Sequence, residues 1–305
     1  MSIPGVNDVE VVEVAPRDGL QNESTILATE DKVRLIELAI AAGVRRMEAV
    51  SFVRPDAVPQ MADAEKVMAQ VPEREDVSYI GLVLNRRGFE RALESGVNEI
   101  NLVIAASDTF NRRNQNASTD ALAVMVEEVL EAAASVGLPA SVTVATAFGC
   151  PFEGEVQVDV VAGLVARAAA AGAVEIALAD TIGVGVPRQV TELFGIARTL
   201  TDIPLRAHFH NTRNTGYANA VAALDGGVRV LDASIGGIGG CPFAPRATGN
   251  IATEDLVYLL DRSRLSSGLS VPALVSAAEY VGERLGTTVP SMVSKAGGFP
   301  SGGAS

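Results

Sequence analysis

The chain has 305 residues, a formal net charge of −13 and a sequence pI of about 4.7. A surface with this charge repels polyphosphate and anionic lipid, so we expect no nucleic-acid and no membrane partner. No stretch approaches the roughly 20 apolar residues of a membrane span, and the first residues lack a signal-peptide pattern. Two cysteines, Cys150 and Cys241, are too few for a disulfide framework, which suits a cytoplasmic location.

Short β-branched runs alternate with longer helical stretches along the whole chain. Strands are expected at 9–16, 45–52, 77–84, 99–106, 141–148, 175–180, 204–211 and 228–235. Several of the helical stretches end in Gly, which is typical of the left-handed residue that follows a helix. Eight strand-then-helix units without a break in composition predict an α/β fold, the closed parallel (β/α)8 TIM barrel.

The predicted barrel forms one catalytic domain over 1–290, and extra C-terminal helices are expected near 253–262 and 271–286. The last segment, 291–305, ends in small residues, and we expect it to be a flexible tail. A doubly wound open sheet is the structural alternative. That fold should show a phosphate-binding Gly loop after its first strand, where this chain has APRDGLQNE (15–23) instead.

In such a barrel the chemistry lies at the C-terminal ends of the strands, so polar residues at those ends are the candidates for a site. The opposite ends of the strands are bland by comparison. The candidates are Arg17, Asp18, Glu48, Ser51, Asn85, Arg86, Ser107, Asp108, Cys150, Asp180, Thr181, His208, His210, Asn211 and the loop 237–250.

His208 and His210 are the only two histidines of the chain, and they lie two residues apart on a predicted strand. Side chains two apart on a strand point to the same face, so both imidazoles can reach one metal ion. The other ligands should be oxygen donors from other strand ends, with Asp18 the best candidate and Asn250 and Asp180 as alternatives. This donor set suits Mg²⁺ or Mn²⁺.

Two further segments draw attention. In PRDG, Pro16 stops the first strand and Gly19 permits a turn, and the adjacent side chains of Arg17 and Asp18 should point in different directions. In SIGGIGGCPFAPRATGN (234–250), four glycines precede Cys241, and they allow a loop that closes over a substrate and carries the thiol in. The loop lacks the Lys of a P-loop.

Taken together, the segments resemble hydroxymethylglutaryl-CoA lyase, a family of metal-dependent barrels that make or break carbon–carbon bonds beside acyl thioesters. The resemblance covers nearly the whole barrel in family order. It rests on APRDGLQNE (15–23), SFVRPDAVPQM (51–61), AFGCPFEG (147–154), LADTIGVG (178–185), HFH (208–210) and GIGGCPFAPRATGNIATEDLVYLL (237–260).

The resemblance implies a role for each matching residue. Asp18, His208, His210 and Asn250 match the metal ligands of the family, and Arg17 matches its catalytic arginine. Glu48 and Asp180 match its active-site carboxylates, and Cys241 matches a loop cysteine that takes part in proton transfer. The family also implies an acyl-CoA substrate, a place in leucine breakdown and, we expect, a homo-oligomer (a dimer or larger).

The reaction implied is the retro-Claisen cleavage of 3-hydroxy-3-methylglutaryl-CoA to acetyl-CoA and acetoacetate. A metal on the tertiary hydroxyl lowers its pKa, a guanidinium such as Arg17 stabilises the enolate, and a thiol such as Cys241 can protonate C2. The group that first removes the hydroxyl proton stays open among Asp180, a histidine and metal-bound hydroxide.

Three departures put the acyl specificity in question. This chain has Ser24 where the family usually has Lys, and Asn211 where it usually has Asp. Arg206 lies two residues before His208, so it should enter the barrel and need a carboxylate partner, for which Glu48 and Asp180 are candidates. The alternatives are therefore a lyase for a longer-branched 3-hydroxyacyl-CoA, a Claisen-condensing synthase of the same barrel group, and a non-catalytic binding protein.

Overall fold

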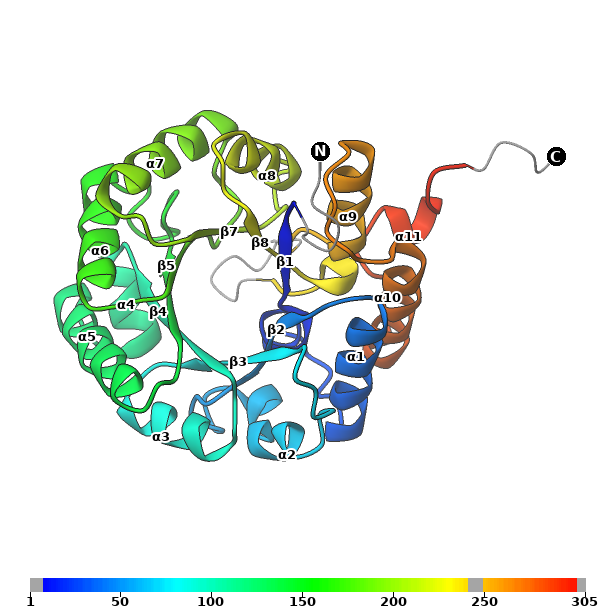
Figure 1. The fold of residues 1–305 in the computed structure, drawn as a ribbon, viewed down its shortest axis with the longest axis horizontal. Coiled ribbons are helices and arrows are strands. Elements are labelled where there is room, and N and C mark those ends of the chain that lie inside the picture. Colours follow the sequence, from blue (N-terminus) through cyan, green and yellow to red (C-terminus); the bar gives the residue numbers. More distant parts are fainter. Residues whose placement is uncertain (1–7, 241–248, 301–305) are drawn as a thin grey trace.

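The computed structural model describes residues 8–240 and 249–300, and it confirms the predicted barrel. Eight parallel strands follow one another around a closed barrel, and the eighth pairs with the first (Figure 1). The strands are β1 (Glu10–Glu13), β2 (Arg46–Ser51), β3 (Ser78–Val83), β4 (Glu99–Ala105), β5 (Ala140–Ala145), β6 (Glu175–Asp180), β7 (Leu205–Phe209) and β8 (Val230–Ala233). All eight lie at the predicted positions.

Helices surround the strands as an outer ring (Figure 1). They are α1 (Thr29–Ala41), α2 (Ala64–Met68), α3 (Arg86–Glu94), α4 (Asp108–Gln115), α5 (Thr119–Ser135), α6 (Val158–Ala170), α7 (Pro187–Leu200), α8 (Gly216–Asp225), α9 (Thr253–Arg262), α10 (Val271–Leu285) and α11 (Val293–Ala296). Short helical turns are η1 (Ala15–Gly19), η2 (Pro59–Met61) and η3 (Ile235–Gly237). The glycines expected after α1, α3, α5 and α6 all have positive φ, at Gly43, Gly96, Gly137 and Gly172.

Side chains at the strand–helix junctions begin several helices. Asn85 accepts a hydrogen bond from the Gly88 amide at the start of α3, and Ser107 accepts one from the Phe110 amide at the start of α4. These contacts satisfy amide groups that the first turn of a helix leaves without partners. They also fix the loops after β3 and β4, which lie at the C-terminal end of the barrel.

The C-terminal helices lie beside the barrel, where α10 packs against α1 (Figure 1). The segment after residue 290, which we expected to be flexible, includes α11, and its first residues are held by Asp255 of α9. Asp255 accepts hydrogen bonds from the Ser291 hydroxyl and from the amides of Met292 and Val293. These contacts hold residues 291–293 against α9, because the Asp255 carboxylate satisfies this run of donors.

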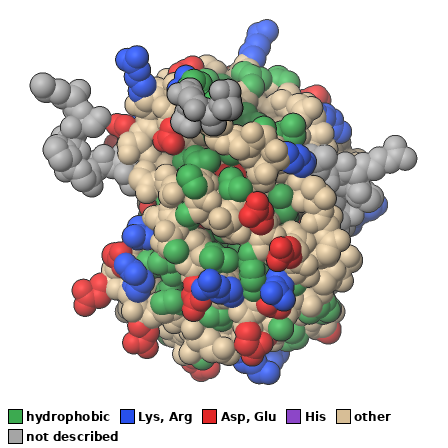
Figure 2. Space-filling view, turned by 90° about the vertical axis from the view of Figure 1, so that its right-hand side faces the viewer, with side chains coloured by type: hydrophobic (Ala, Val, Ile, Leu, Met, Phe, Trp, Pro, Cys, Tyr) green, Lys and Arg blue, Asp and Glu red, His purple; other side chains and the backbone are tan. Residues whose placement is uncertain are grey.

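On the side of the molecule that Figure 2 shows, charged side chains of both signs are interspersed with hydrophobic ones, and no histidine is visible. None of the helices in 8–240 and 249–300 is long and apolar enough to cross a membrane. The core is mostly aliphatic, and both histidines are buried.

Candidate active site

A cavity of about 730 Å³ opens at the C-terminal ends of the strands. Side chains from most strands reach it, among them Arg17, Asp18, Asn101, Thr143, Thr181, His208, His210 and Asp232. Its volume lies within the roughly 300–1,000 Å³ that is usual for small-molecule sites. The position agrees with the rule that barrel enzymes carry their chemistry at this end.

Asp18, His208 and His210 converge in this cavity. The Nε2 atoms of both histidines lie 3.9 Å from Asp18 Oδ2, and one ligand atom from each of the three residues lies within 4.8 Å of the others. These separations leave room between the atoms for one divalent cation at a usual ligand distance of roughly 2.0–2.6 Å. Within 8–240 and 249–300 no second group of three such side chains meets this criterion. The three residues form a possible metal site.

The charges around this group favour an ionised Asp18 and a neutral His210. Burial opposes ionisation of Asp18, but Arg17 and the two imidazoles outweigh it and hold the pKa of Asp18 well below its ordinary range. Burial, followed by the charge of His208, lowers the pKa of His210 to about 4. A carboxylate and a neutral imidazole are the forms that bind a cation.

His208 differs from His210 in its second nitrogen. Its Nδ1 lies 3.1 Å from Asp232 Oδ2 on β8. Burial disfavours a charged His208, but the hydrogen bond to Asp232 and the charges of Asp18 and Asp232 outweigh burial and raise its pKa. By contrast, the buried Nδ1 of His210 has no hydrogen-bond partner in the described part of the chain.

Arg17 lies beside Asp18, because the chain after β1 winds into the π-helical turn η1 rather than continuing as a strand. One guanidinium nitrogen of Arg17 is 2.8 Å from Asp18 Oδ1, and its Nε is 2.8 Å from Glu48 Oε2. The expectation that Arg17 and Asp18 point in different directions was therefore wrong. A helical turn brings adjacent side chains closer than a strand does.

Gly19 ends this turn without positive φ, so its conformation does not require glycine. A Cβ at Gly19 would lie 2.8 Å from side-chain atoms of Ser234 and Ile238, which follow β8. The glycine therefore lets the segment carrying Asp18 lie directly on the loop after β8. This close approach, rather than the turn expected from the sequence, explains the residue.

Glu48 is buried under Arg17 rather than facing the cavity. In addition to its contacts with Arg17, its other carboxylate oxygen accepts a hydrogen bond from Asn101 Nδ2 at 3.1 Å. Thr143 donates to Asn101 Oδ1 at 3.0 Å. The sequence analysis overlooked Asn101 and Thr143, although a polar residue within an otherwise apolar strand was a signal that could have found them. The arrangement makes Glu48 a group that orients Arg17.

Asn250 lies next to Asp18, as its predicted role requires. Its Nδ2 donates to Asp18 Oδ2 at 2.8 Å and to the Ile238 carbonyl at 3.1 Å. A Cβ at Gly239, which has a φ of 105°, would lie 2.7 Å from the Asn250 amide nitrogen. The absence of a side chain at Gly239 thus lets the backbone after β8 lie directly against Asn250 and Asp18. Cys241, the candidate proton donor, lies outside the described residues.

Asp180 is fully buried and serves its own loop. The amides of Val184 and Gly185 each donate to one of its oxygens at 2.9 Å. Burial raises the pKa of Asp180, against the effect of these amides. It is not among the residues that line the cavity. The departure Asn211 also serves its loop, because its side-chain oxygen accepts from the Gly216 amide at 3.2 Å.

The expected partners of Arg206 were wrong. Arg206 is 2% exposed and does enter the barrel, but its guanidinium nitrogens lie 3.2 Å from Glu175 and 3.3 Å from Asp232. Glu48 and Asp180 are not its ion-pair partners, because the parallel register places Asp232 opposite His208 and therefore beside the side chain two residues earlier. Asp232 was also missed, although a lone acid in an apolar strand was its signal.

The sequence suggested that the N-terminal ends of the strands carry few polar side chains, but the structure shows a cluster of charged residues there. Arg46, the first residue of β2, contacts both Glu99 and Glu175, which begin β4 and β6, at 2.6–3.0 Å. Glu10 of β1 lies 3.4 Å from the same guanidinium. Alternate strands of a barrel contribute side chains to one layer, which explains why residues so distant in the sequence meet.

Comparisons with known proteins place the chain among acyl-CoA lyases. A family model described as HMGL-like matches residues 8–281. An (R)-citramalyl-CoA lyase from Chloroflexus aurantiacus is 44% identical over 300 residues, which are 95% of each chain. A hydroxymethylglutaryl-CoA lyase from Pseudomonas mevalonii is 43% identical over 280 residues, covering 92% of this chain and 93% of that protein. The structure of an HMG-CoA lyase from Acinetobacter baumannii in complex with coenzyme A and 3-methylmalate has a TM-score of 0.94 and 38% identity, covering 100% and 99% of the two chains.

Proposed function

Because this chain belongs to the HMGL-like family and is a carbon–carbon lyase, we propose that it cleaves a 3-hydroxy-3-methylacyl-CoA that carries a free carboxylate. The first candidate is 3-hydroxy-3-methylglutaryl-CoA, with acetyl-CoA and acetoacetate as products. The observation that carries the proposal is the convergence of Asp18, His208 and His210 beside a buried arginine in the cavity.

The donor set suits a divalent cation such as Mg²⁺ or Mn²⁺, held by Asp18, His208 and His210 with Asn250 as the proposed fourth ligand. When bound, such a cation would act as a Lewis acid toward the tertiary hydroxyl of the substrate and lower its pKa. Asn250 already holds Asp18 in place through its amide group.

Arg17 is proposed to stabilise the negative charge that the reaction creates. As the hydroxyl proton leaves and the C2–C3 bond breaks, a carbonyl forms at C3 and the bonding electrons move into the thioester as an enolate. A guanidinium that keeps its charge suits this oxygen. The contacts with Glu48 and Asp18 hold Arg17 in a fixed orientation at the cavity, so little reorganisation is needed during the reaction.

A proton must then reach C2 to give acetyl-CoA. We assign this step to the thiol of Cys241 on the strength of the family resemblance. Among the buried carboxylates, Asp180 has both oxygens engaged by backbone amides and Glu48 is engaged by Arg17 and Asn101. These contacts favour orienting roles for both.

The coenzyme A portion is proposed to cross the rim of the cavity, where Arg54 and Arg113 are among the lining residues. Arg113 lies over the Phe152 ring at 4.1 Å, and this contact holds its charge at the edge of the cavity. Two cationic groups here can attract an anionic ligand despite the net charge of −13. The related enzyme from Acinetobacter baumannii was solved in complex with coenzyme A.

A second candidate substrate is (R)-citramalyl-CoA, favoured by the relative that is 44% identical over 95% of each chain. This compound also has a tertiary hydroxyl and a methyl group at C3, but its free carboxylate is one methylene closer to C3. The same bond cleavage would give acetyl-CoA and pyruvate.

The deciding experiment measures kcat/KM of the purified enzyme with Mg²⁺ for both compounds, by following acetoacetate and pyruvate separately. We expect acetyl-CoA in equal amounts to the oxo acid formed. Turnover of one substrate at least tenfold better than the other identifies the acyl group. Absence of cleavage of either compound, in a folded and metal-loaded protein, would overturn the proposal.

A further inference from the structure

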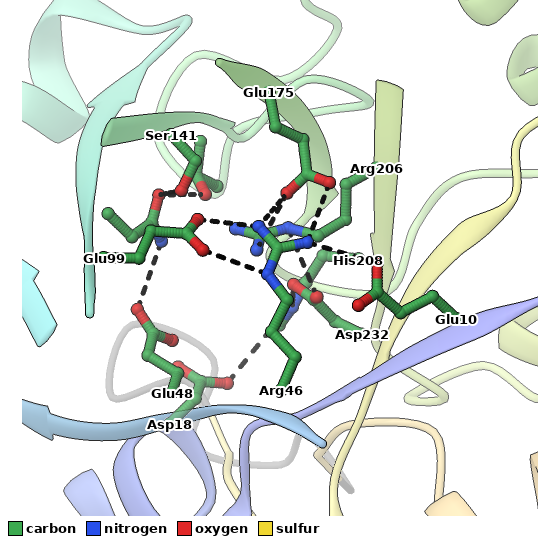
Figure 3. A network of polar contacts seen from close by, with 12 residues as sticks. Glu10, Asp18, Arg46, Glu48, Glu99, Ser141, Glu175, Arg206, His208 and Asp232 are labelled. Atoms are coloured by element: carbon green, nitrogen blue, oxygen red, sulfur yellow. Dashed lines mark hydrogen bonds and ion pairs between the residues drawn. The ribbon is translucent and has the colours of Figure 1, made fainter. Parts of the chain in front are cut away.

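One buried carboxylate connects His208 to an arginine in the barrel wall. Asp232 Oδ2 lies 3.1 Å from His208 Nδ1. Asp232 Oδ1 lies 3.3 Å from Arg206 Nε, and this contact is an ion pair without hydrogen-bond geometry. Figure 3 shows Asp232 between the two side chains, with Glu175 on the far side of Arg206. Arg206, Asp232 and His208 are 2%, 5% and 7% exposed, so these contacts lie inside the barrel.

The chemistry of these groups determines where the proton of a neutral His208 lies. A carboxylate only accepts hydrogen bonds and a guanidinium only donates them. Asp232 can therefore face Nδ1 of His208 only if that nitrogen carries the proton. Nε2, which points to Asp18, is then left with its lone pair, and only an unprotonated ring nitrogen binds a cation.

His210 provides a contrast within the same site. Its Nδ1 is buried without a hydrogen-bond partner in the part of the chain that the structure describes. No protein group there fixes its tautomer. The control of the proton position is therefore specific to His208.

The polar contacts extend from this pair to both ends of the barrel. A continuous series of ion pairs and hydrogen bonds joins three arginines to five carboxylates inside the barrel. Its charged members, connected through His208, are Arg17, Arg46, Arg206, Asp18, Glu48, Glu99, Glu175 and Asp232. All of them except Arg17 are labelled in Figure 3. Glu10, whose side chain is 48% exposed, adjoins Arg46 at the solvent side.

We propose that Asp232 and Arg206 are positioning residues that hold His208 in the Nδ1–H tautomer and so present its Nε2 to the cation. The presence of the cation rests on the proposed function. The role of Asp232 and Arg206 does not depend on which acyl substrate the enzyme cleaves. Asp232 acts by accepting the Nδ1 proton. Arg206 acts by occupying the other oxygen of Asp232, which fixes how that side chain is turned.

The role of Arg206 gives an unusual prediction for Asp232→Asn. Arg206 can face only the oxygen of the new amide, so the NH₂ group must face His208 Nδ1. That nitrogen then has to accept, and His208 adopts the Nε2–H tautomer. Metal affinity should fall by roughly 10–100-fold, the usual effect of losing a partner behind a metal ligand.

Two further variants separate positioning from general damage. Glu99→Gln is the matched control, because it makes the same carboxylate-to-amide change in the same buried network, where Glu99 pairs with Arg46 rather than with a histidine. It should leave the tautomer and the metal affinity unchanged. In the double variant Asp232→Asn/Arg206→Met, the amide oxygen is free to turn toward His208. The Nδ1–H tautomer should return.

The experiment uses ¹⁵N-histidine-labelled metal-free protein at alkaline pH, where the histidines are neutral. Correlation spectra report which ring nitrogen carries the proton, and His210→Gln assigns the two residues, since the chain has only two histidines. Titration with Mn²⁺ measures affinity on the same samples. Circular dichroism checks that each variant folds. If the double variant does not fold, Asp232→Asn and Glu99→Gln alone decide the test.

The proposal is overturned if His208 carries its proton on Nε2 in the parent protein. It is also overturned if Asp232→Asn leaves the tautomer unchanged, or if Glu99→Gln shifts it equally. An inactive parent enzyme with the expected tautomer would instead contradict the proposed function alone. An active enzyme whose Asp232→Asn variant binds Mn²⁺ like the parent would contradict this inference alone.

Discussion

The two ends of the barrel interior use the same kinds of side chains in different states of pairing. At the N-terminal end, Arg46 makes two-pronged contacts with both Glu99 and Glu175. At the C-terminal end, Asp18 and the two histidines meet around a space large enough for a cation, beside the cavity. Side chains whose charges are fully paired with one another indicate a structural role. Side chains whose ligand atoms converge on an open space indicate a binding site.

Arginine substitutions at the two ends should have opposite consequences. Arg17→Met removes the charge proposed to stabilise the enolate, so turnover should fall by about 10³-fold or more, since a single neutral donor already contributes ~10²–10³. Circular dichroism should show a folded protein, because Glu48 keeps its contact with Asn101. Steady-state kinetics that retain a tenth of the parent turnover would contradict this role.

The cysteines allow a second comparison, between the loop after β8 and the loop after β5. Cys241→Ser should lower turnover by roughly 10²–10⁴-fold if the thiol is the general acid, because a serine hydroxyl is a far weaker acid. Cys150→Ser is the control. Cys150 is buried, with its sulfur 2.9 Å from Ser107 Oγ, and its variant should remain active. Equal activity of both variants would show that the Cys241 thiol is not the proton donor.

Arg46→Met tests the N-terminal end. Removing Arg46 from this buried ion-pair network leaves Glu99 without a cationic partner and Glu175 with Arg206 alone. The loss of one partner of a buried ion pair typically costs about 3–5 kcal/mol of unfolding free energy. Urea denaturation measures that cost, and turnover of the folded fraction should stay near the parent value. Loss of turnover without loss of stability would mean that the two ends are not separable.

Glu13 tests the stability of the fold through its pH dependence rather than through loss of a charge pair. It is fully buried at the end of β1, and its carboxylate accepts from the Ala15 and Ile235 amides and from Thr253. Burial, which outweighs these hydrogen bonds, raises its pKa to about 8. The folded protein then keeps this proton up to about pH 8, whereas the unfolded chain releases it near the ordinary pKa of 4.5.

The sign follows from proton binding. Between these two pKa values the folded state binds more protons, so this contribution to stability is present at low pH and is lost as the pH rises, by at most ~1.4 kcal/mol per unit. Glu13→Gln should remove that slope. Urea denaturation at several pH values between 5 and 8 compares the two proteins, and parallel curves would show that Glu13 does not hold the proton.

Local patterns made most of the fold predictable. Most strands lie within short apolar runs that alternate with helical stretches. The two histidines, which lie two residues apart, indicated one wall of the candidate site. Contacts set by the barrel register were not predictable in the same way. The partners of Arg206 come from β6 and β8, and the layer around Arg46 gathers the first residues of alternate strands. Nor does a Pro-Arg-Asp-Gly segment reveal the π-helical turn that turns Arg17 back onto Asp18.

The central claim is that Asp18, His208 and His210 hold one divalent cation on which cleavage depends. Its most direct test is a Mn²⁺ titration of metal-free protein, followed by electron paramagnetic resonance and by turnover of 3-hydroxy-3-methylglutaryl-CoA and citramalyl-CoA in the same samples. We expect one Mn²⁺ per chain, activity that rises in proportion to occupancy, and loss of both in His210→Ala. Full turnover by the metal-free protein, or Mn²⁺ binding by His210→Ala equal to that of the parent, would contradict it.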